Sequence, residues 1–201
     1  MINIINYECG NFISIFSILK SLNIECKITS DKDEIINSEK IILPGVGSFD
    51  HCIQSLKKFK LYNIIKECIL EKKIKTLGIC VGMQILTTLS EEGNEKGLNI
   101  LSGQVYKLQT TTNIKVPHIG WNKISLLKNS PLLKNLKDSK FYFCHSYYVE
   151  LENKSYEVAS TLYGKKFCSI LHKENLYGVQ FHPEKSLDNG IQLLRNFALE
   201  I

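Results

Sequence analysis

The stretch Leu77-Gly78-Ile79-Cys80-Val81-Gly82-Met83-Gln84 places one cysteine between two glycines, directly after an apolar run. We predict a strand over Lys75–Ile79 and a helix over Gly82–Leu89, so Cys80 occupies the turn between them. Glycines on either side relieve crowding at a sharp strand-to-helix turn, and such a turn exposes the side chain beside the helix N-terminus. The partial positive charge there favours a thiolate, the nucleophilic form of cysteine. The pattern taken alone fits a tight turn around a buried thiol equally well.

The segments before this turn alternate between short β-branched runs and helical apolar spacing. They predict strands over Ile2–Asn6, Glu25–Thr29 and Lys40–Leu43, and helices over Phe12–Leu22 and Leu61–Glu71. This alternation is typical of an α/β fold with a parallel sheet and helices on both faces. Ligands of such folds bind at the carboxyl ends of the strands, where both Cys80 and the loop Pro44-Gly45-Val46-Gly47 fall.

The second half has a different pattern, with short runs of strand-forming residues separated by turns. It predicts strands over Gly103–Leu108, Phe141–Leu151, Glu157–Leu162, Lys166–His172 and Leu176–Phe181, and a last helix from about Leu187 to Leu199. Neither a repeat nor a low-complexity linker separates the two halves. We therefore expect a single domain over residues 1–201.

Composition excludes several classes of protein. The net charge of +5 comes from scattered lysines, so we expect no nucleic-acid partner. No apolar run approaches the ~18–20 residues of a membrane helix, and the start MINIINYECGN lacks the features of a secretory signal. Seven cysteines without a C-x-x-C pair argue against a disulfide framework or a zinc site and favour a reducing cytoplasm. Four of them are expected to be core residues: Cys26, Cys52, Cys68 and Cys168.

A reactive thiol needs a base, and His182 is the strongest candidate among five histidines. It ends a predicted strand, Pro183 follows it, and Glu184 lies two residues on, where side chains of an extended segment point the same way. Glu184 can then orient the His182 ring, as the third member of a nucleophile–base–orienter set does. A solvated loop with an incidental His-Pro-Glu is the alternative. The other histidines are predicted either at the surface (His51, at an expected helix start, and His172) or in structural or pocket-lining positions (His118 and His145).

Three stretches together resemble the class I, triad-type glutamine amidotransferase family: LGICVGMQ, GVQFHPEKS and LPGVGSF. The resemblance implies a flavodoxin-like three-layer α/β fold with a mostly parallel central sheet and extra antiparallel strands in the second half. More narrowly, PHIGWN at 117–122, FCHSYY at 143–148 and HPEKS at 182–186 resemble the glutaminase subunits of imidazole glycerol phosphate synthase, an enzyme of histidine biosynthesis.

The family resemblance also implies roles for individual residues. Cys80 would attack the side-chain amide of L-glutamine to form a glutamyl thioester, His182 would protonate the departing ammonia and later activate water, and Glu184 would hold the imidazole. A second group would supply oxyanion donors or bind glutamine: Gly45, Val46, Gly47, Val81, Gln84, His145, Ser146 and Tyr147. Neither a cofactor nor a metal is implied.

Relatives of this kind dock on a cyclase subunit of (β/α)₈-barrel type, forming a heterodimer in which ammonia passes through the barrel. The residues implied at that interface are Asn11, Trp121, Tyr142 and Lys185, although a lone tryptophan is also a common core residue. The family pattern D-Y-G-x-G-N-L reads here as Asn6-Tyr7-Glu8-Cys9-Gly10-Asn11-Phe12, with an acid in place of a glycine near this face. A glutaminase that serves a surface-sugar amidotransferase therefore remains an alternative. A stand-alone triad cysteine hydrolase is a second one, because the triad pattern by itself does not require a partner.

Overall fold

A central sheet of eight strands organises the molecule, whose computed structural model describes all residues from 1 to 201. The strand order is β2-β1-β3-β4-β13-β12-β11-β8, and every pairing from β2 to β13 is parallel. The parallel strands are β1 (Ile2–Ile5), β2 (Cys26–Thr29), β3 (Lys40–Leu43), β4 (Lys75–Ile79) and β13 (Leu176–Val179). Antiparallel pairing extends the sheet through β12 (Lys165–Lys173), β11 (Glu157–Tyr163) and β8 (Ser125–Leu126).

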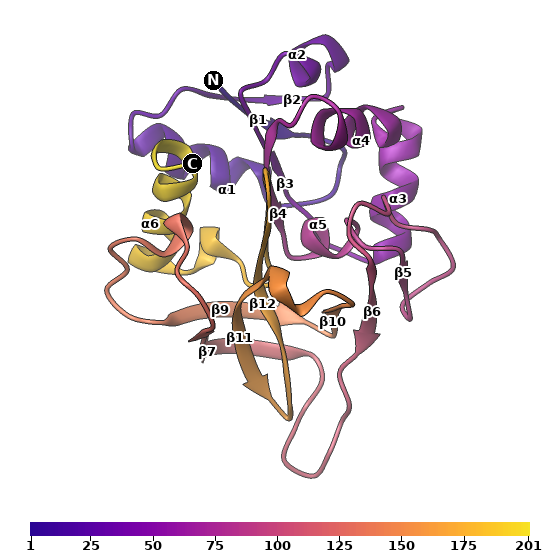
Figure 1. Cartoon of the computed structure of the whole chain (residues 1–201), viewed down its shortest axis with the longest axis vertical. Helices are drawn as coiled ribbons and strands as arrows, with labels where there is room; N and C mark the ends of the chain where they lie inside the picture. Colours follow the sequence, from indigo (N-terminus) through magenta and orange to yellow (C-terminus); the bar gives the residue numbers. More distant parts are fainter.

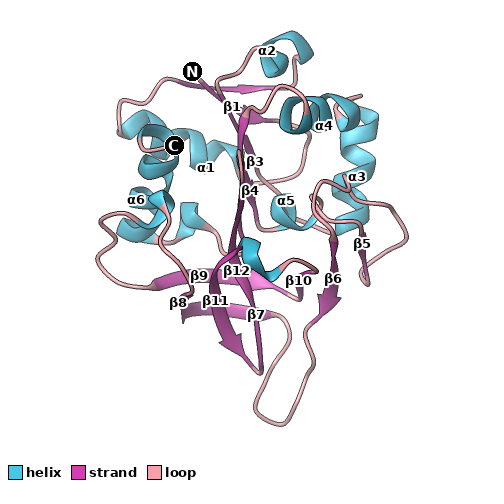
Figure 2. Ribbon diagram, in the orientation of Figure 1, coloured by secondary structure: helices cyan, strands magenta, loops and turns pink.

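Helices cover both faces of this sheet, as the strand–helix alternation predicts (Figures 1 and 2). One face carries α1 (Phe12–Ser21) and α6 (Leu187–Leu199), which contact each other. The other carries α3 (Phe49–Lys58), α4 (Tyr62–Leu70) and the short α5 (Val81–Gln84), with α2 (Lys32–Ile36) packed on α4. The predicted α/β architecture, with a mostly parallel sheet and antiparallel additions from the second half, is confirmed.

Two smaller sheets lie beyond the parallel strands, near the lower part of Figure 1. One joins β5 (Leu89–Ser90), β6 (Gly103–Lys107) and β10 (Tyr147–Leu151). The other is an antiparallel ribbon of β7 (His118–Lys123) and β9 (Lys140–His145). Single turns of 3₁₀ helix occur at Pro131–Leu133, Lys154–Tyr156 and Pro183–Lys185.

Two predicted elements are wrong in their extent. The single strand predicted over Phe141–Leu151 is broken at Ser146, because β9 pairs with β7 whereas β10 pairs with β6 in another sheet. The helix predicted to reach Leu89 ends at Gln84, after which the Thr87 hydroxyl donates to the Gln84 carbonyl (2.8 Å) and the chain turns into β5. The pattern did not reveal α2, β5, β7 or β8, whereas α3 begins near the expected helix start at His51.

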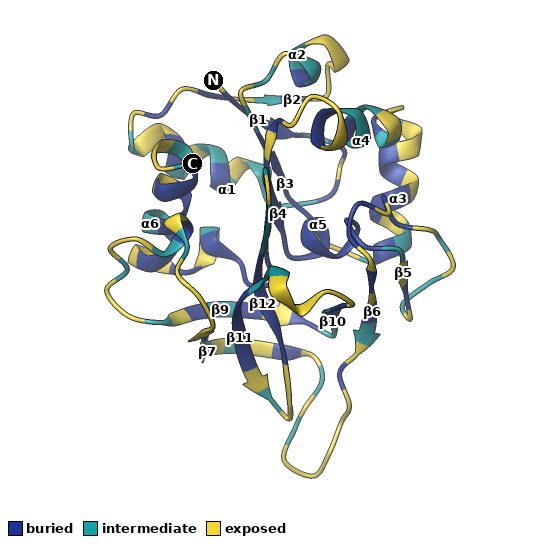
Figure 3. Ribbon diagram, viewed as in Figure 1, coloured by how far each residue is buried: buried dark blue, intermediate teal, exposed yellow.

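A single cluster of 54 buried apolar residues spans both halves of the chain, and the central strands are almost entirely buried (Figure 3). The four cysteines predicted in the core are buried there. Trp121 is 49% exposed on β7, so the core interpretation of this tryptophan is wrong. None of the helices combines the length and the apolar character that crossing a membrane requires.

Candidate active site

Cys80 lies in the turn between β4 and α5 with φ of 54° and ψ of −113°, a conformation that residues with side chains rarely adopt. Its N–H donates to the Val179 carbonyl on the neighbouring strand (2.8 Å). A Cβ at Gly82 would lie 1.9 Å from the Leu43 carbonyl oxygen, and one at Gly78 would lie 2.7 Å from the Gly82 oxygen. The glycines are therefore required because the first turn of α5 packs directly against β3 and β4, which holds Cys80 at the carboxyl end of the sheet.

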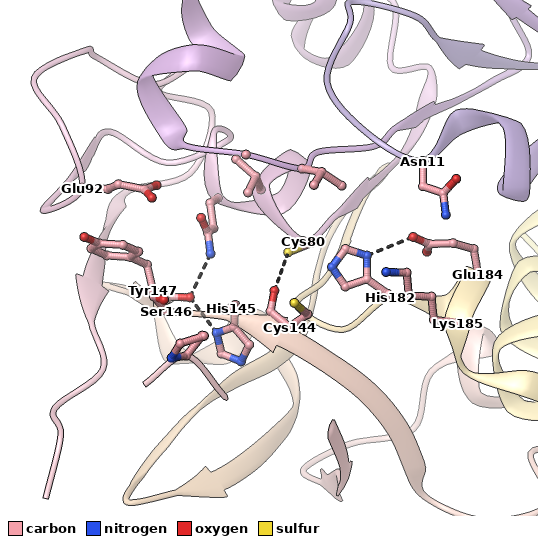
Figure 4. A pocket seen from close by; sticks show the side chains of 15 residues that line it. Asn11, Cys80, Glu92, Cys144, His145, Ser146, Tyr147, His182, Glu184 and Lys185 are labelled. Atoms are coloured by element: carbon pink, nitrogen blue, oxygen red, sulfur yellow. Dashed lines mark hydrogen bonds and ion pairs between the residues drawn. The ribbon is translucent and has the colours of Figure 1, made fainter. Parts of the chain in front are cut away.

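His182 reaches Cys80 because β13 lies parallel beside β4 and the chain continues past its end. The Nδ1 atom of His182 lies 2.9 Å from Oε1 of Glu184, and the two side chains are only 6% and 1% exposed. The backbone of His182 is fixed as well: its N–H donates to the Tyr142 carbonyl (2.9 Å), and its carbonyl accepts from the Ser186 hydroxyl (2.6 Å). The ring is thus held between Cys80 and Glu184 (Figure 4).

The electrostatic balance at His182 favours its charged form. Burial lowers the pKa of the imidazole, but charge and hydrogen bonding from Cys80 and from Glu184 outweigh this and raise the pKa to about 11. An imidazolium beside the sulfur stabilises a thiolate at Cys80. With Nδ1 occupied by Glu184, Nε2 is the nitrogen left to exchange a proton with the sulfur or with a leaving group.

A cavity of about 290 Å³ opens at this point. It is lined by the triad and by most of the residues predicted to bind substrate or supply oxyanion donors, namely Val46, Gly47, Val81, Gln84, His145, Ser146 and Tyr147. Gly45 does not line it, because Gly45 packs against the start of α5, where a Cβ would lie 2.1 Å from the Gly82 nitrogen. The Cys144 carbonyl lies over the sulfur of Cys80 at 4.0 Å (Figure 4).

The four residues predicted at a partner interface gather at the mouth of the cavity and beside it. Asn11 and Lys185 line the cavity itself. Tyr142 lies outside the cavity, 5.8 Å from the Lys185 ammonium (ring centroid), and its ring meets the Trp121 ring edge-on at 6.1 Å. The two aromatic rings and the ammonium thus form one continuous surface next to the opening.

Two polar side chains of the site, Gln180 and Glu92, were missed by the sequence reasoning. Gln180 directs its Nε2 at the Cys80 sulfur (3.7 Å) and accepts from Gln84 through Oε1 (3.2 Å). Its position two residues before His182, in the strand predicted over Leu176–Phe181, is a signal that was available. Glu92 lines the cavity and accepts from the Phe49 N–H (2.8 Å); burial is the main cause of its raised pKa. Glu92 follows β5 in an irregular segment, so no periodic pattern marks it.

The arrangement can perform nucleophilic substitution at a carbonyl carbon. A thiolate, an imidazolium that can donate a proton and a carboxylate that orients the ring surround a small cavity with polar walls. No group of three or more His, Cys, Asp or Glu side chains is arranged to hold a metal ion.

Comparison with known proteins gives consistent matches along the chain. Residues 3–201 match the family model described as glutamine amidotransferase class-I. The chain is 45% identical to the imidazole glycerol phosphate synthase subunit HisH of Leptospira borgpetersenii, covering 98% of this chain and 99% of the relative. It is 42% identical to subunit HisH 2 of Methanococcus maripaludis, covering 98% of both chains.

Solved structures agree on the architecture. A structure described as a glutamine amidotransferase superposes with a TM-score of 0.75 at 17% identity, over 98% of this chain and 96% of the other. The structure of PurLQS from Thermotoga maritima superposes with a TM-score of 0.71, also at 17% identity, over 98% of this chain and 96% of that chain. At this level of identity these matches establish the fold alone.

Proposed function

The chain belongs to the class I glutamine amidotransferase family, and on that premise we propose that it is the glutaminase subunit of an imidazole glycerol phosphate synthase. It hydrolyses L-glutamine to L-glutamate and ammonia, and the ammonia passes to a synthase subunit of histidine biosynthesis. The observation that carries the proposal is the set formed by Cys80, His182 and Glu184 at one end of parallel strands, in a chain that matches HisH subunits over its full length.

The reaction proceeds through a covalent intermediate. The Cys80 thiolate attacks the side-chain amide carbon of glutamine and forms a tetrahedral adduct. His182 donates the proton on Nε2 to the amide nitrogen, the C–N bond breaks, and ammonia leaves a glutamyl thioester on the sulfur. Water then adds to the thioester while His182 takes its proton, and the C–S bond breaks to release glutamate and regenerate the thiolate. Glu184 keeps the imidazole in the required orientation throughout.

Backbone N–H groups stabilise the oxyanion of both tetrahedral adducts. Val81 is the first residue of α5, so its N–H has no partner within the helix and is available to the developing charge. Val46 and Gly47 border the same cavity from the loop after β3, so their N–H groups are the second source of donors that we propose.

Polar groups at the far side of the cavity recognise the amino-acid end of the substrate. The half-buried carboxylate of Glu92 complements the α-ammonium group of glutamine, and Gln84, Ser146 and Tyr147 border the remaining space. A cavity of about 290 Å³ lies just below the roughly 300–1,000 Å³ typical of small-molecule sites. This size supports a free amino acid and argues against the larger substrate of a stand-alone triad hydrolase.

Ammonia released into bulk water would be protonated and lost as a nucleophile, so the product requires a direct path to the synthase subunit. We propose a (β/α)₈-barrel cyclase as that subunit, docked on the surface of Asn11, Trp121, Tyr142 and Lys185, in a heterodimer. Half-exposed Trp121, beside an aromatic ring and a cation, has the composition of a binding hot spot. All seven thiols are free, which fits a reducing cytoplasm.

The experiment that tests the proposal pairs the chain with candidate partners. We expect co-purification with the histidine-pathway cyclase subunit, and a glutaminase rate that rises at least tenfold when that subunit and its ligand are added. Stimulation by a surface-sugar amidotransferase alone would replace the histidine-pathway assignment; the acid at Glu8, near the expected partner face, motivates including this partner. Full glutaminase activity of the isolated chain, unaffected by any partner, would instead favour a stand-alone hydrolase.

A further inference from the structure

Three polar residues outside the triad form a hydrogen-bonded line that ends in the wall of the cavity. His118 on β7 and His145 on β9 are direct cross-strand partners, and their Nδ1 and Nε2 atoms lie 3.0 Å apart. Nδ2 of Asn122 lies 3.3 Å from the other nitrogen of His118. Nδ1 of His145 lies 2.8 Å from the Tyr147 carbonyl oxygen (Figure 4).

The position of every proton in this line follows from its two ends. The Asn122 side-chain oxygen accepts from the Lys123 N–H (2.8 Å), so its amide nitrogen faces His118 as a donor. Nε2 of His118 therefore accepts, its Nδ1–H donates to Nε2 of His145, and Nδ1–H of His145 donates to the Tyr147 carbonyl. A carbonyl oxygen can only accept, so the opposite end requires the same direction.

The surroundings of the two histidines are apolar and aromatic. The His118 ring stacks between Phe143 (4.8 Å between centroids) and Tyr163 (3.9 Å), and His145 packs against Phe167 (5.1 Å). Burial lowers the pKa of His118 to about 4 and is also the main cause of the lowered pKa of His145, about 3. Buried imidazoles are costly unless every nitrogen is paired, which is the case here. A phenylalanine would fill such space without that cost, so the pairing indicates a directional role.

The carbonyl at the end of the line is connected to the nucleophile. The Tyr147 oxygen accepts a second hydrogen bond, from Nε2 of Gln84 (2.9 Å). The same Gln84 nitrogen lies 3.2 Å from Oε1 of Gln180, whose Nε2 points at the Cys80 sulfur (3.7 Å). The orientation of the Tyr147 peptide therefore decides where the Gln84 side chain lies in the cavity.

We propose that Asn122, His118 and His145 are positioning residues that fix the Tyr147 carbonyl, and through it Gln84 and the 145–147 wall, in the arrangement that binds glutamine. The inference rests on the proposed function, because it assigns the line to that substrate. None of the three residues needs to touch a reacting atom. Their contribution is a preorganised substrate site and should be expressed in substrate binding more than in turnover.

Two substitutions at His145 separate this role from simple packing. His145→Asn keeps a side-chain nitrogen close to the place of Nδ1 and can still donate to Tyr147, whereas His145→Leu fills the space without a donor. In the complex with the synthase subunit, we expect His145→Leu to raise the KM for glutamine about tenfold with kcat within about threefold, and His145→Asn to stay within about threefold of the wild type in both. Equal KM values for the two variants would overturn the proposal.

If His145→Leu does not fold, His118→Leu serves in its place, because it removes the donor to His145 and leaves the Tyr147 bond unsupported. We expect it to raise the KM about threefold with little change in kcat. A KM equal to that of the wild type would count against the line.

A measurement that does not depend on activity tests the geometry itself. The ¹⁵N shifts of the imidazole nitrogens in the isolated chain should assign His118 and His145 to the Nδ1–H tautomer. An Nε2–H tautomer at either residue would overturn the line. If the wild-type complex does not hydrolyse glutamine, the proposed function fails together with the substrate assignment, whereas the tautomers still decide whether the line exists.

Discussion

Two groups of buried histidines lie close together in this molecule and have opposite electrostatics. His182, at the end of the central sheet, is buried next to a thiol and a carboxylate, and its pKa is raised to about 11. His118 and His145, in the β7–β9 ribbon, are buried among aromatic rings, and their pKa values are lowered to about 4 and about 3. Burial opposes the charged form in all three, so burial alone does not decide the protonation state.

The groups that contact each imidazole ring determine its protonation state. His182 faces two groups that carry negative charge, and their attraction exceeds the cost of removing an imidazolium from water. His118 and His145 face an amide nitrogen, a carbonyl and each other, and their bonding pattern requires exactly one proton on each ring. One region is therefore suited to moving protons and the other to holding them in fixed places. The predictions below test this contrast, from the largest expected effect to the smallest.

Removal of the Cys80 thiol should have the largest effect, because it takes away both the nucleophile and one of the two groups that keep His182 charged. We expect Cys80→Ala to lower glutamine-dependent activity by roughly 10³-fold or more, because no other group can form the thioester, while activity with added ammonium salts remains. The pKa of His182, read by NMR titration, should fall because its anionic partner is gone. Cys26→Ala on the edge strand β2 is the matched control and should retain activity. Retained glutamine-dependent turnover in Cys80→Ala would exclude the triad mechanism.

Neutralising the Glu184 carboxylate should weaken the stabilisation of the His182 imidazolium but leave the Cys80 nucleophile in place. Glu184→Gln keeps the shape of the side chain but removes the charge that orients and stabilises the imidazolium, so kcat/KM should fall by roughly 10²–10⁴-fold. Steady-state kinetics of the complex measure this. The control is Glu174→Gln, which removes only an exposed ion pair with Lys73 (3.0 Å) and should leave the kinetics unchanged. Similar kinetics for the two variants would mean that Glu184 does not act on His182.

Acid should destabilise the folded chain through His118 and His145, the neutral histidines of the β7–β9 ribbon. The pKa values of His118 and His145 are lowered on folding, so their contribution to stability is complete above pH 6.5 and is lost as the pH falls from 6.5 towards 4. Each should cost about 1.4 kcal/mol per pH unit in this window, since the unfolded chain binds a proton that the folded chain does not. The raised pKa of His182 has the opposite effect: its contribution to stability is complete below pH 6.5 and is lost as the pH rises from 6.5 through the folded value of about 11.

Urea unfolding at a series of pH values measures the loss. A variant that carries both His118→Phe and His145→Leu supplies the comparison, because its free energy of unfolding should depend less on pH between 6.5 and 4. Equal pH dependence of this variant and the wild type would show that the two histidines titrate as freely in the folded chain as in the unfolded one.

Trp121 lies where the two regions meet, on β7 next to Asn122 and edge-on to Tyr142. We expect Trp121→Ala to weaken binding of the synthase subunit by about tenfold, or about 1.4 kcal/mol, and to leave the melting temperature nearly unchanged because half of the ring is exposed. Titration calorimetry and thermal unfolding check the two parts. Leu199→Ala, an exposed leucine near the end of α6, is the control. A large fall in melting temperature with unchanged partner binding would make Trp121 a structural residue.

Much of this molecule could be predicted from local pattern. The β-branched runs and helical spacings gave the parallel strands and α1, α4 and α6, because each depends on a periodicity within the segment itself. The glycines around Cys80 predicted the strained turn, since only residues without a Cβ allow α5 to approach β3 so closely. The two-residue spacing of His182 and Glu184 predicted their contact, but the extended backbone expected there is wrong: Pro183–Lys185 forms a turn of 3₁₀ helix, and this turn brings the Glu184 carboxylate to the His182 ring.

Only the tertiary structure decided which residues distant in the sequence lie next to each other. The apolar run of 141–151 continues through Ser146 without a change of period, and it is divided only because β7 and β6 offer separate edges to pair with. His118 and His145 meet through the register of that ribbon, and Glu92 enters the cavity from an irregular segment. The sequence pattern determines which way a side chain points from its own element, whereas sheet register and packing determine which groups it contacts. Those contacts decide whether a buried histidine is charged or neutral.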